Sequence, residues 1–259
     1  MTVPLTDFRA VAVTAHLFTS YRRTWLDSVF NSFVLPLCLL TGIGWSVGRY
    51  VGDELQPGVS YFAFVGAGLL ATSVVQIGAA ESAWAVFGGF EWSRIYHAMR
   101  LTPASPTDIM TGHLAAVVGR ATLGGLSFLI VIELFGVGHR WTALAVVPLL
   151  PLFAVSIAAP VMAFSATVRS AGMFDVLFRI GIVPMAMFSG VYFPLDVLPA
   201  PLHAVVLALP LTHAVDLSRM LLLGSGTAQD AAVDLLCLAV WAGAGLALAR
   251  RAFSRRLSD

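Results

Sequence analysis

The chain has 259 residues, of which 58% are hydrophobic and 11% are charged, with a formal net charge of +1 and a mean hydropathy of +0.87. Soluble domains carry about 25% charged residues, so this chain could not cover its apolar surface in water, and we expect it to lie in a lipid bilayer. The nearly balanced charge excludes a nucleic-acid-binding protein, which needs a basic surface. All 15 basic residues are arginine, which excludes any mechanism that requires a lysine.

The N-terminal segment, residues 1–28, has the pattern of a helix that lies on the membrane surface. Between Leu5 and Trp25, apolar residues recur at helical spacing, while Arg9, His16 and Arg23 fall elsewhere on the helical wheel. The apolar residues are Phe8, Val11, Ala12, Ala15 and Phe18. Such a helix would rest on the inner leaflet of the bilayer. The alternative is a leader segment that faces water.

Six stretches are long and apolar enough to cross a bilayer, which takes about 20 residues. They are Val29–Val47, Val59–Ala80, Thr111–Phe135, Trp141–Val168, Val176–Tyr192 and Ala231–Ala249. The sequence therefore predicts an all-α membrane protein that forms one domain over residues 1–259. Spans one to five lie within 29–192, an outer segment covers 193–228, and 229–259 holds span six and a cytoplasmic tail.

The apolar stretch from Leu202 to Leu223 leaves a seventh crossing open. Cytoplasmic loops of membrane proteins carry an excess of basic residues. With six spans and a cytoplasmic N-terminus, most of the arginines lie on the inner side, and the outer loops hold Arg49, Arg140 and Arg219. A seventh span would move the arginine cluster of residues 250–256 outside. The distribution therefore favours six spans with both ends in the cytoplasm.

The long inner loop, Glu81–Met110, contains two predicted elements. Ser105, Pro106 and Asp108 have the pattern of a helix start, with a capping hydroxyl, a proline at the first helical position and a carboxylate at the third. We expect span three to begin there, as a helix in the cytoplasm. Upstream, Glu91–Leu101 predicts a short amphipathic helix suited to docking a partner, although a passive connector would have the same pattern.

The outer segment between spans five and six is interrupted by prolines. Backbone left unpaired in hydrocarbon is costly, so an apolar segment broken in this way must dip into the membrane as two half-helices or pack against protein. We expect short re-entrant helices at about Leu202–Leu209 and Thr212–Leu223. Asp216 and Arg219 are three residues apart and could pair, which would lower the cost of their charges. The prolines are Pro194, Pro199, Pro201 and Pro210.

Motifs of enzyme chemistry are missing from the sequence. Without lysine there is no Walker A motif, and neither a zinc-protease motif nor a serine with an evident histidine partner is found. Arg120 and Glu133 in span three lie about 20 Å apart along a helix, too far to pair with each other. We expect both to reach the membrane interfaces, so that a proton-coupled secondary transporter remains only an alternative.

The run FSGVYFPLDVLPAPLHAVVLALPLTHAVDLSRMLLLG, Phe188–Gly224, resembles a signature of ABC-2 type permeases. It is most similar to the branch that contains the nodulation-factor and daunorubicin-type drug-export permeases. Its matching parts are Phe188–Asp196, Leu198-Pro199 and Leu209–Asp216. The stretch Ala98–Gly112 resembles the Thr-Pro-x-x-x-x-Asp-Ile-x-x-Gly pattern of the family. Tyr21–Trp25 is similar to the sequence that precedes span one, with Thr24 where the family often has asparagine.

The resemblance implies roles that the residues alone do not assign. Permeases of this family pair with each other and with two copies of an ATP-binding-cassette ATPase, which would bind ATP and Mg²⁺, so no cofactor is expected in this chain. They have a coupling helix in the first inner loop, which makes Glu91, Arg94, His97 and Arg100 candidates for contacting the ATPase. Re-entrant helices form the outer closure of the path. The candidates for this closure are Phe193, Pro194, Asp196, Pro210, Asp216 and Arg219.

The sequence therefore predicts the permease subunit of an exporter, working as a homodimer and moving an amphipathic drug, lipid or glycolipid. Import, or lipid flipping without release, is an alternative within the same class. A membrane component of an ATPase-bearing sensor complex that transports nothing is an alternative from another class. Such sensors usually carry a large outer domain, and no loop of this chain is long enough for one.

Overall fold

The computed structural model describes residues 10–11, 13–15, 34–51, 59–137 and 140–258, and no β-strand is found among them. The predicted first span, Val29–Val47, falls in part on α3 (Leu35–Val51). Residues 29–33 of that span lie outside the described residues. The all-α prediction is therefore confirmed for the part of the chain that the structure describes.

The second predicted span continues beyond its expected end at Ala80. α4 (Tyr61–Ala80) runs without a break through the π-helical turn η2 (Glu81–Ala85) into α5 (Val86–Glu91). The expected loop boundary at Glu81 is wrong because Arg120 neutralises this residue across the bundle, with 3.0 Å between Arg120 Nη2 and Glu81 Oε2. A paired charge can stay inside a helix bundle where an unpaired one would be expelled.

The predicted start of span three is confirmed. α7 (Pro106–Leu134) begins after Ser105, whose hydroxyl accepts a hydrogen bond from the Asp108 amide at 3.1 Å. The Asp108 carboxylate in turn accepts one from the Ser105 amide at 2.9 Å, which completes a capping box. The amphipathic helix expected at Glu91–Leu101 is shorter, α6 (Ile95–Arg100), because Arg94 adopts a left-handed conformation, with a φ of 50°, and separates it from α5.

The predicted spans four and six pack closely side by side. Span four consists of α8 (Arg140–Val146), the 3₁₀ turn η3 (Val147–Leu149) and α9 (Leu150–Thr167). Span six is α14 (Ala228–Ser258), which continues past its expected end at Ala249, so the arginine-rich tail is helical. A Cβ atom at Gly245 of α14 would lie 2.4 Å from Pro160 Cδ of α9, so only glycine allows this approach.

The outer segment contains the two expected helices. One helical stretch from Gly172 to Phe188, made of α10 (Gly172–Val176), η4 (Leu177–Ile182) and α11 (Val183–Phe188), occupies the position of span five. The chain then passes through η5 (Leu195–Val197) to α12 (Ala200–Val206) and α13 (Pro210–Leu223), which are bent by 82° relative to each other. The bend follows from Pro210, because the residue before a proline favours extended backbone and Leu209 has a ψ of 139°.

Four helical stretches among the described residues are long and apolar enough to cross a membrane. They are Tyr61–Glu91, Pro106–Leu134, Thr142–Thr167 and Ala228–Ser258. The bent pair α12 and α13 would be a fifth if it is one broken span. The expected span five, Val176–Tyr192, ends at Phe188 and is too short to qualify by length. Six crossings and the re-entrant path of α12 and α13 therefore stay predictions.

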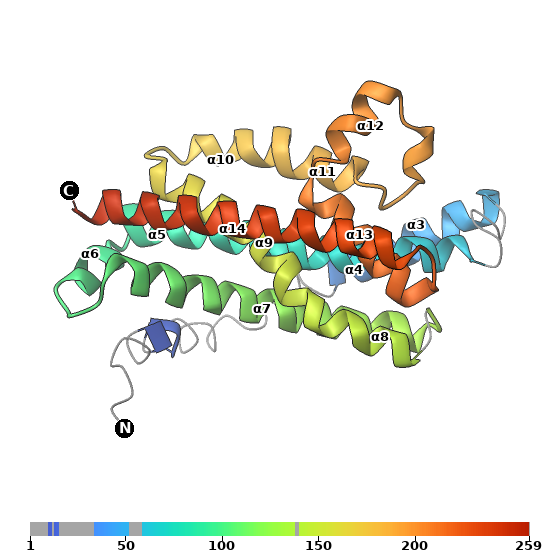
Figure 1. The fold of residues 1–259 in the computed structure, drawn as a ribbon, viewed down its shortest axis with the longest axis horizontal. Helices are drawn as coiled ribbons and strands as arrows, with labels where there is room; N and C mark the ends of the chain where they lie inside the picture. Colours follow the sequence, from blue (N-terminus) through green and yellow to red (C-terminus); the bar gives the residue numbers. More distant parts are fainter. Residues whose placement is uncertain (1–9, 12, 16–33, 52–58, 138–139, 259) are drawn as a thin grey trace.

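The helices surround two buried clusters of apolar side chains. The larger lies between α4, α7, α9 and α13, and includes Phe64, Phe128 and Phe153. The smaller lies between α5, α6, α7, α9 and α14 and includes Phe90, Tyr96 and Phe253. Figure 1 shows α5, α6 and the C-terminus at one end of the molecule, and α3, α8 and α12 toward the other. The elements expected on the two sides of the membrane thus lie at opposite ends.

Candidate functional site

The short helix α6 is anchored to the bundle by Tyr96. This side chain is 1% exposed, and its hydroxyl lies 2.8 Å from Nδ1 of His113 on α7. Its ring packs against Phe90 of α5 and Phe253 of α14, with centroid distances of 4.8 and 5.7 Å. A Cβ at Gly89 would lie 2.4 Å from the ring, so glycine is needed for α5 to accept it. One buried aromatic residue therefore holds α6 against three helices.

The opposite face of α6 is open. Arg94, His97 and Arg100, three of the four residues expected to contact an ATPase, are exposed. Two apolar side chains that the sequence analysis did not select accompany them, Trp92 at 66% exposure and Leu101 at 91%. Exposed aromatic and arginine side chains next to each other are typical of protein interfaces. We call these five residues the α6 face.

Glu91, the fourth candidate, is engaged within the chain. Its carboxylate accepts a hydrogen bond from Nη2 of Arg256 near the end of α14. Nη1 of Arg256 donates to the carbonyls of Ser165, Ala166 and Val168 at 3.2, 2.9 and 3.0 Å. These three carbonyls lie at the C-terminal end of α9, where carbonyl groups have no hydrogen-bond donor within the helix. Arg256 therefore ties α5, α9 and α14 together, a role that no local pattern could have indicated.

The turn Ser189–Phe193, part of the signature run, is held tightly on α4. A Cβ at Gly68 would lie 3.1 Å from the Val191 backbone, so the turn lies directly on the helix. The Tyr61 hydroxyl donates to the Tyr192 carbonyl at 3.1 Å. Gly190 has a φ of 79°, which favours glycine at this position. The close approach therefore depends on Gly68 of α4 and on Gly190 within the turn.

Arg219 is buried beneath this turn, and its guanidinium bonds backbone oxygens rather than forming a salt bridge with Asp216. Its Nη2 donates to the carbonyls of Gly190 and Val191, the second at 3.2 Å, and its guanidinium lies 3.5 Å from the centre of the Phe64 ring. No ion pair joins Asp216 and Arg219 among the residues that the structure describes. The spacing of Asp216 and Arg219 could not reveal this arrangement, because the turn that supplies the oxygen acceptors lies far away in the sequence.

The break between α12 and α13 is closed by side chains. The Val206 carbonyl accepts from the Leu209 amide at 3.0 Å, and side chains add a bond to each of the three consecutive carbonyls Val206, Leu207 and Ala208. The Thr212 hydroxyl donates to Val206, His213 Nε2 to Leu207 and Trp241 Nε1 of α14 to Ala208, at 2.8, 2.9 and 2.9 Å. The Leu-Pro-Leu-Thr-His run, Leu209–His213, thus breaks the helix with its proline and supplies two of these donors, while α14 supplies the third through Trp241. A broken helix within a membrane requires this compensation.

His213 also connects α13 to α14. Its Nδ1 lies 2.7 Å from Oδ1 of Asp234, and both side chains are buried. Both ring nitrogens therefore face oxygen atoms, one carboxylate and one carbonyl. Imidazole can donate from both nitrogens only when protonated; otherwise the carboxyl group must carry the proton. In either case His213 and Asp234 together carry one proton more than a neutral imidazole and an ionised carboxylate would.

A cavity of about 450 Å³ opens between residues 194–196, α13 and the start of α14. Among the six predicted closure residues, Pro194, Asp196, Asp216 and Arg219 line it, whereas Phe193 and Pro210 do not. His213, Asp230 and Asp234 also line it. No group of three or more His, Cys, Asp or Glu side chains in the described ranges is arranged to hold a metal ion.

Arg120 forms an ion pair within the helix bundle that the sequence did not predict. Its side chain is 13% exposed and pairs with Glu81, which is 26% exposed, in the middle of the bundle. Glu133 lies one residue before the end of α7, as its position in the sequence suggested. The ion pair was missed because Glu81 was placed in a loop, outside span two.

The surface helix predicted over Leu5–Trp25 lies largely outside the described residues. Ala10, Val11 and residues 13–15 are helical and contact α7. The Thr14 hydroxyl donates to the Gly112 carbonyl at 3.1 Å, and a Cβ at Gly112 would lie 2.7 Å from Val13 Cβ. Val11 is 62% exposed on a different face. This part of the segment therefore packs on the bundle through Val13, a residue outside the expected apolar stripe.

Comparisons with known proteins agree with the signature. The family described as ABC-2 type transporter matches residues 10–223. Nodulation protein J of Rhizobium leguminosarum bv. viciae is 30% identical over 238 residues, 92% of this chain and 91% of its own. That of Rhizobium meliloti (strain 1021) is 30% identical over 223 residues, 86% and 84% of the two chains. Nodulation protein J of Bradyrhizobium diazoefficiens is 27% identical over 255 residues, which are 98% of this chain and 96% of its own. The chain therefore belongs to the ABC-2 type transporter family, as a membrane permease subunit.

Proposed function

We propose that the chain is the permease of an ATP-binding-cassette exporter, in which two copies enclose a path and two copies of a separate ATPase supply the energy. The observation that carries the proposal is the α6 face, an exposed surface of arginine, histidine and apolar side chains on a rigidly anchored helix. Membership of the ABC-2 type transporter family supports an ATPase as its partner. ATP binding would draw the ATPases together and press on α6, and Tyr96 would pass the displacement to α5, α7 and α14.

The arrangement of charges supports placing α6 in the cytoplasm. Arg94, Arg100 and Arg169 lie toward the same end of the bundle as the arginines of residues 250–256, and cytoplasmic ends of membrane proteins are rich in arginine. The opposite end holds the turn Ser189–Phe193 and the bent pair α12 and α13. In this orientation, these elements form the outer closure of the path, and both termini lie in the cytoplasm.

The cargo we propose is an amphipathic molecule, such as a lipid, a glycolipid or a lipophilic drug. Its support is the resemblance of Phe188–Gly224 to export permeases that carry such molecules, together with relatives named nodulation protein J. Export rather than import is supported by the same branch.

The partner can be tested by isolating the complex. The tagged chain, purified from its own bacterium in mild detergent, is expected to carry an ATP-binding-cassette ATPase in a 1:1 ratio, and the mass of the complex should equal two copies of each. ATP hydrolysis should accompany the complex and be absent from the chain purified alone. Hydrolysis by the chain alone, abolished by a point substitution within it, would contradict the proposal.

A further inference from the structure

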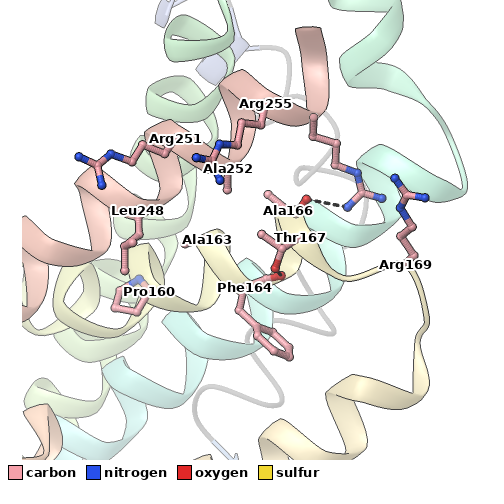
Figure 2. Close-up of a pocket in the computed structure, with 11 residues that line it drawn as sticks. Pro160, Ala163, Phe164, Ala166, Thr167, Arg169, Leu248, Arg251, Ala252 and Arg255 are labelled. Carbon is pink, nitrogen blue, oxygen red and sulfur yellow. Dashed lines mark hydrogen bonds between the residues drawn. The ribbon is translucent and has the colours of Figure 1, made fainter. Parts of the chain in front are cut away.

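At the end of the bundle that carries the C-terminus, α9 and α14 enclose a cavity of about 600 Å³ that the export mechanism does not use. Figure 2 shows Arg251 and Arg255 on α14 and Arg169 just beyond α9 around it, above the apolar side chains of Pro160, Phe164 and Leu248. We propose that this cavity binds an anionic phospholipid, with the phosphate among the arginines and an acyl chain along the apolar wall.

The charge of the cavity has one sign. Four arginines line it and no carboxylate does. Arg256 is occupied by the α9 carbonyls and Glu91, whereas Arg169, Arg251 and Arg255 are exposed and, among the described residues, form no ion pair. Guanidinium groups bind phosphate oxygens through paired N–H donors. Three such groups around one hollow would therefore attract a phosphate diester.

The cavity also lies at the depth where a phosphate would be found. From Ala228 to Arg251, α14 extends about 35 Å, slightly more than the hydrocarbon thickness of about 30 Å. No charged residue lies on α14 between Asp234 and Arg250. The arginines therefore begin where the hydrocarbon ends, at the level of the headgroups.

The apolar wall distinguishes a lipid from a soluble anion or an acidic protein surface. Leu248 is 53% exposed and lies about one helical turn closer to the membrane centre than Arg251. A free phosphate or an acidic loop would leave this wall unused, whereas an acyl chain would cover it. Basic hollows between membrane helices are a known type of site for anionic lipid headgroups.

The test compares lipids on the purified full-length permease in a neutral detergent. Phosphatidylglycerol is added in steps and the midpoint of thermal unfolding is recorded, with phosphatidylcholine and inorganic phosphate as parallel titrations. We expect phosphatidylglycerol alone to raise the midpoint. In the double variant Arg251→Gln, Arg255→Gln, its half-effective concentration should rise about 20-fold, since each arginine near a headgroup adds attraction. Arg250→Gln is the matched control, because Arg250 is a neighbouring exposed arginine that does not line the cavity.

The phosphatidylglycerol retained per chain after purification, measured by mass spectrometry, gives a second readout that remains usable if the double variant is less stable. Retention should fall in the double variant and in Arg255→Gln, but not in Arg250→Gln. The proposal is overturned if phosphatidylcholine acts equally, if Arg250→Gln behaves like the double variant, or if inorganic phosphate protects as well as the lipid. Loss of ATPase binding with unchanged lipid retention in the double variant would instead assign these arginines to the partner protein.

Discussion

Single side chains hold together segments that are far apart in the sequence of this permease. His213 joins the end of α12, the start of α13 and Asp234 of α14, and Arg219 joins α13 to the turn on α4. Buried polar groups of this kind are costly when one partner is lost, because the remaining partner stays buried without a hydrogen bond. The packing of α12 and α13 on the bundle therefore depends on complete pairs rather than on individual charges.

His213→Ala should lower the free energy of unfolding by about 3 kcal/mol, because it leaves both the Asp234 carboxylate and the Leu207 carbonyl unpaired. Replacing both members, His213→Leu with Asp234→Leu, should cost less than His213→Ala, since no buried charge remains. Thermal unfolding in detergent measures both effects. His203→Ala, at a half-buried histidine on α12, is the control and should change little. Equal losses from the two histidine variants would show that His213 has no special role in stability.

At the scale of helices, the closest approach lies between α9 and α14. Gly245→Ala places a methyl group 2.4 Å from Pro160 Cδ, and the helices must separate, at a cost of about 1–3 kcal/mol. Gly243→Ala on the same helix meets no atom within 4 Å and should be neutral or slightly stabilising, because alanine favours helix over glycine. The two variants differ only in the face of α14 that they change. A comparison of their unfolding midpoints therefore isolates packing from helix propensity.

The α6 face gives a second test at this scale. Arg94→Glu with Arg100→Glu should reduce copurification of the ATPase by tenfold or more, because both charges of an exposed docking surface are reversed. Membrane insertion and thermal stability should stay unchanged, since the anchor Tyr96 is untouched. Arg250→Glu reverses an exposed arginine outside α6 and serves as the control. Normal assembly and normal transport with the double reversal would move the coupling site elsewhere.

For the whole molecule, local chemistry predicted where helices begin and break, but not which helices meet. Ser105, Pro106 and Asp108 define the start of α7, and Pro210 defines the bend, because each acts on its own neighbouring backbone. The pairs Arg120 with Glu81 and Arg256 with Glu91 join residues that are far apart in sequence, and no spacing rule connects them. Thr212 and His213 lie within the signature run but were not selected from it, and their partners Val206 and Asp234 followed only from the folded chain.

The direction of the chain through the membrane is the property on which the exporter proposal depends most. If Phe193–Ala228 starts and ends outside, the loop before α14 is extracellular and the C-terminus is cytoplasmic. Single cysteines at Ser225 and Ala228, in a background with Cys38 and Cys237 replaced by alanine, should then react with an impermeant thiol reagent in intact cells. Both native cysteines are free, so their replacement breaks no disulfide. A cysteine at the exposed Ser258 should react only after the membrane is opened.

Opposite labelling of the two ends of α14 is the expected result, because this helix of 31 residues, about 46 Å long, is more than sufficient to cross the bilayer once. Labelling of Ser258 from outside, with Ser225 protected, would mean that the bent pair α12 and α13 crosses the membrane completely and that the chain has an odd number of crossings. The C-terminal arginines would then lie outside, against the usual charge distribution. In that case α12 and α13 could not form an outer closure, and the mechanism built on them would have to be abandoned.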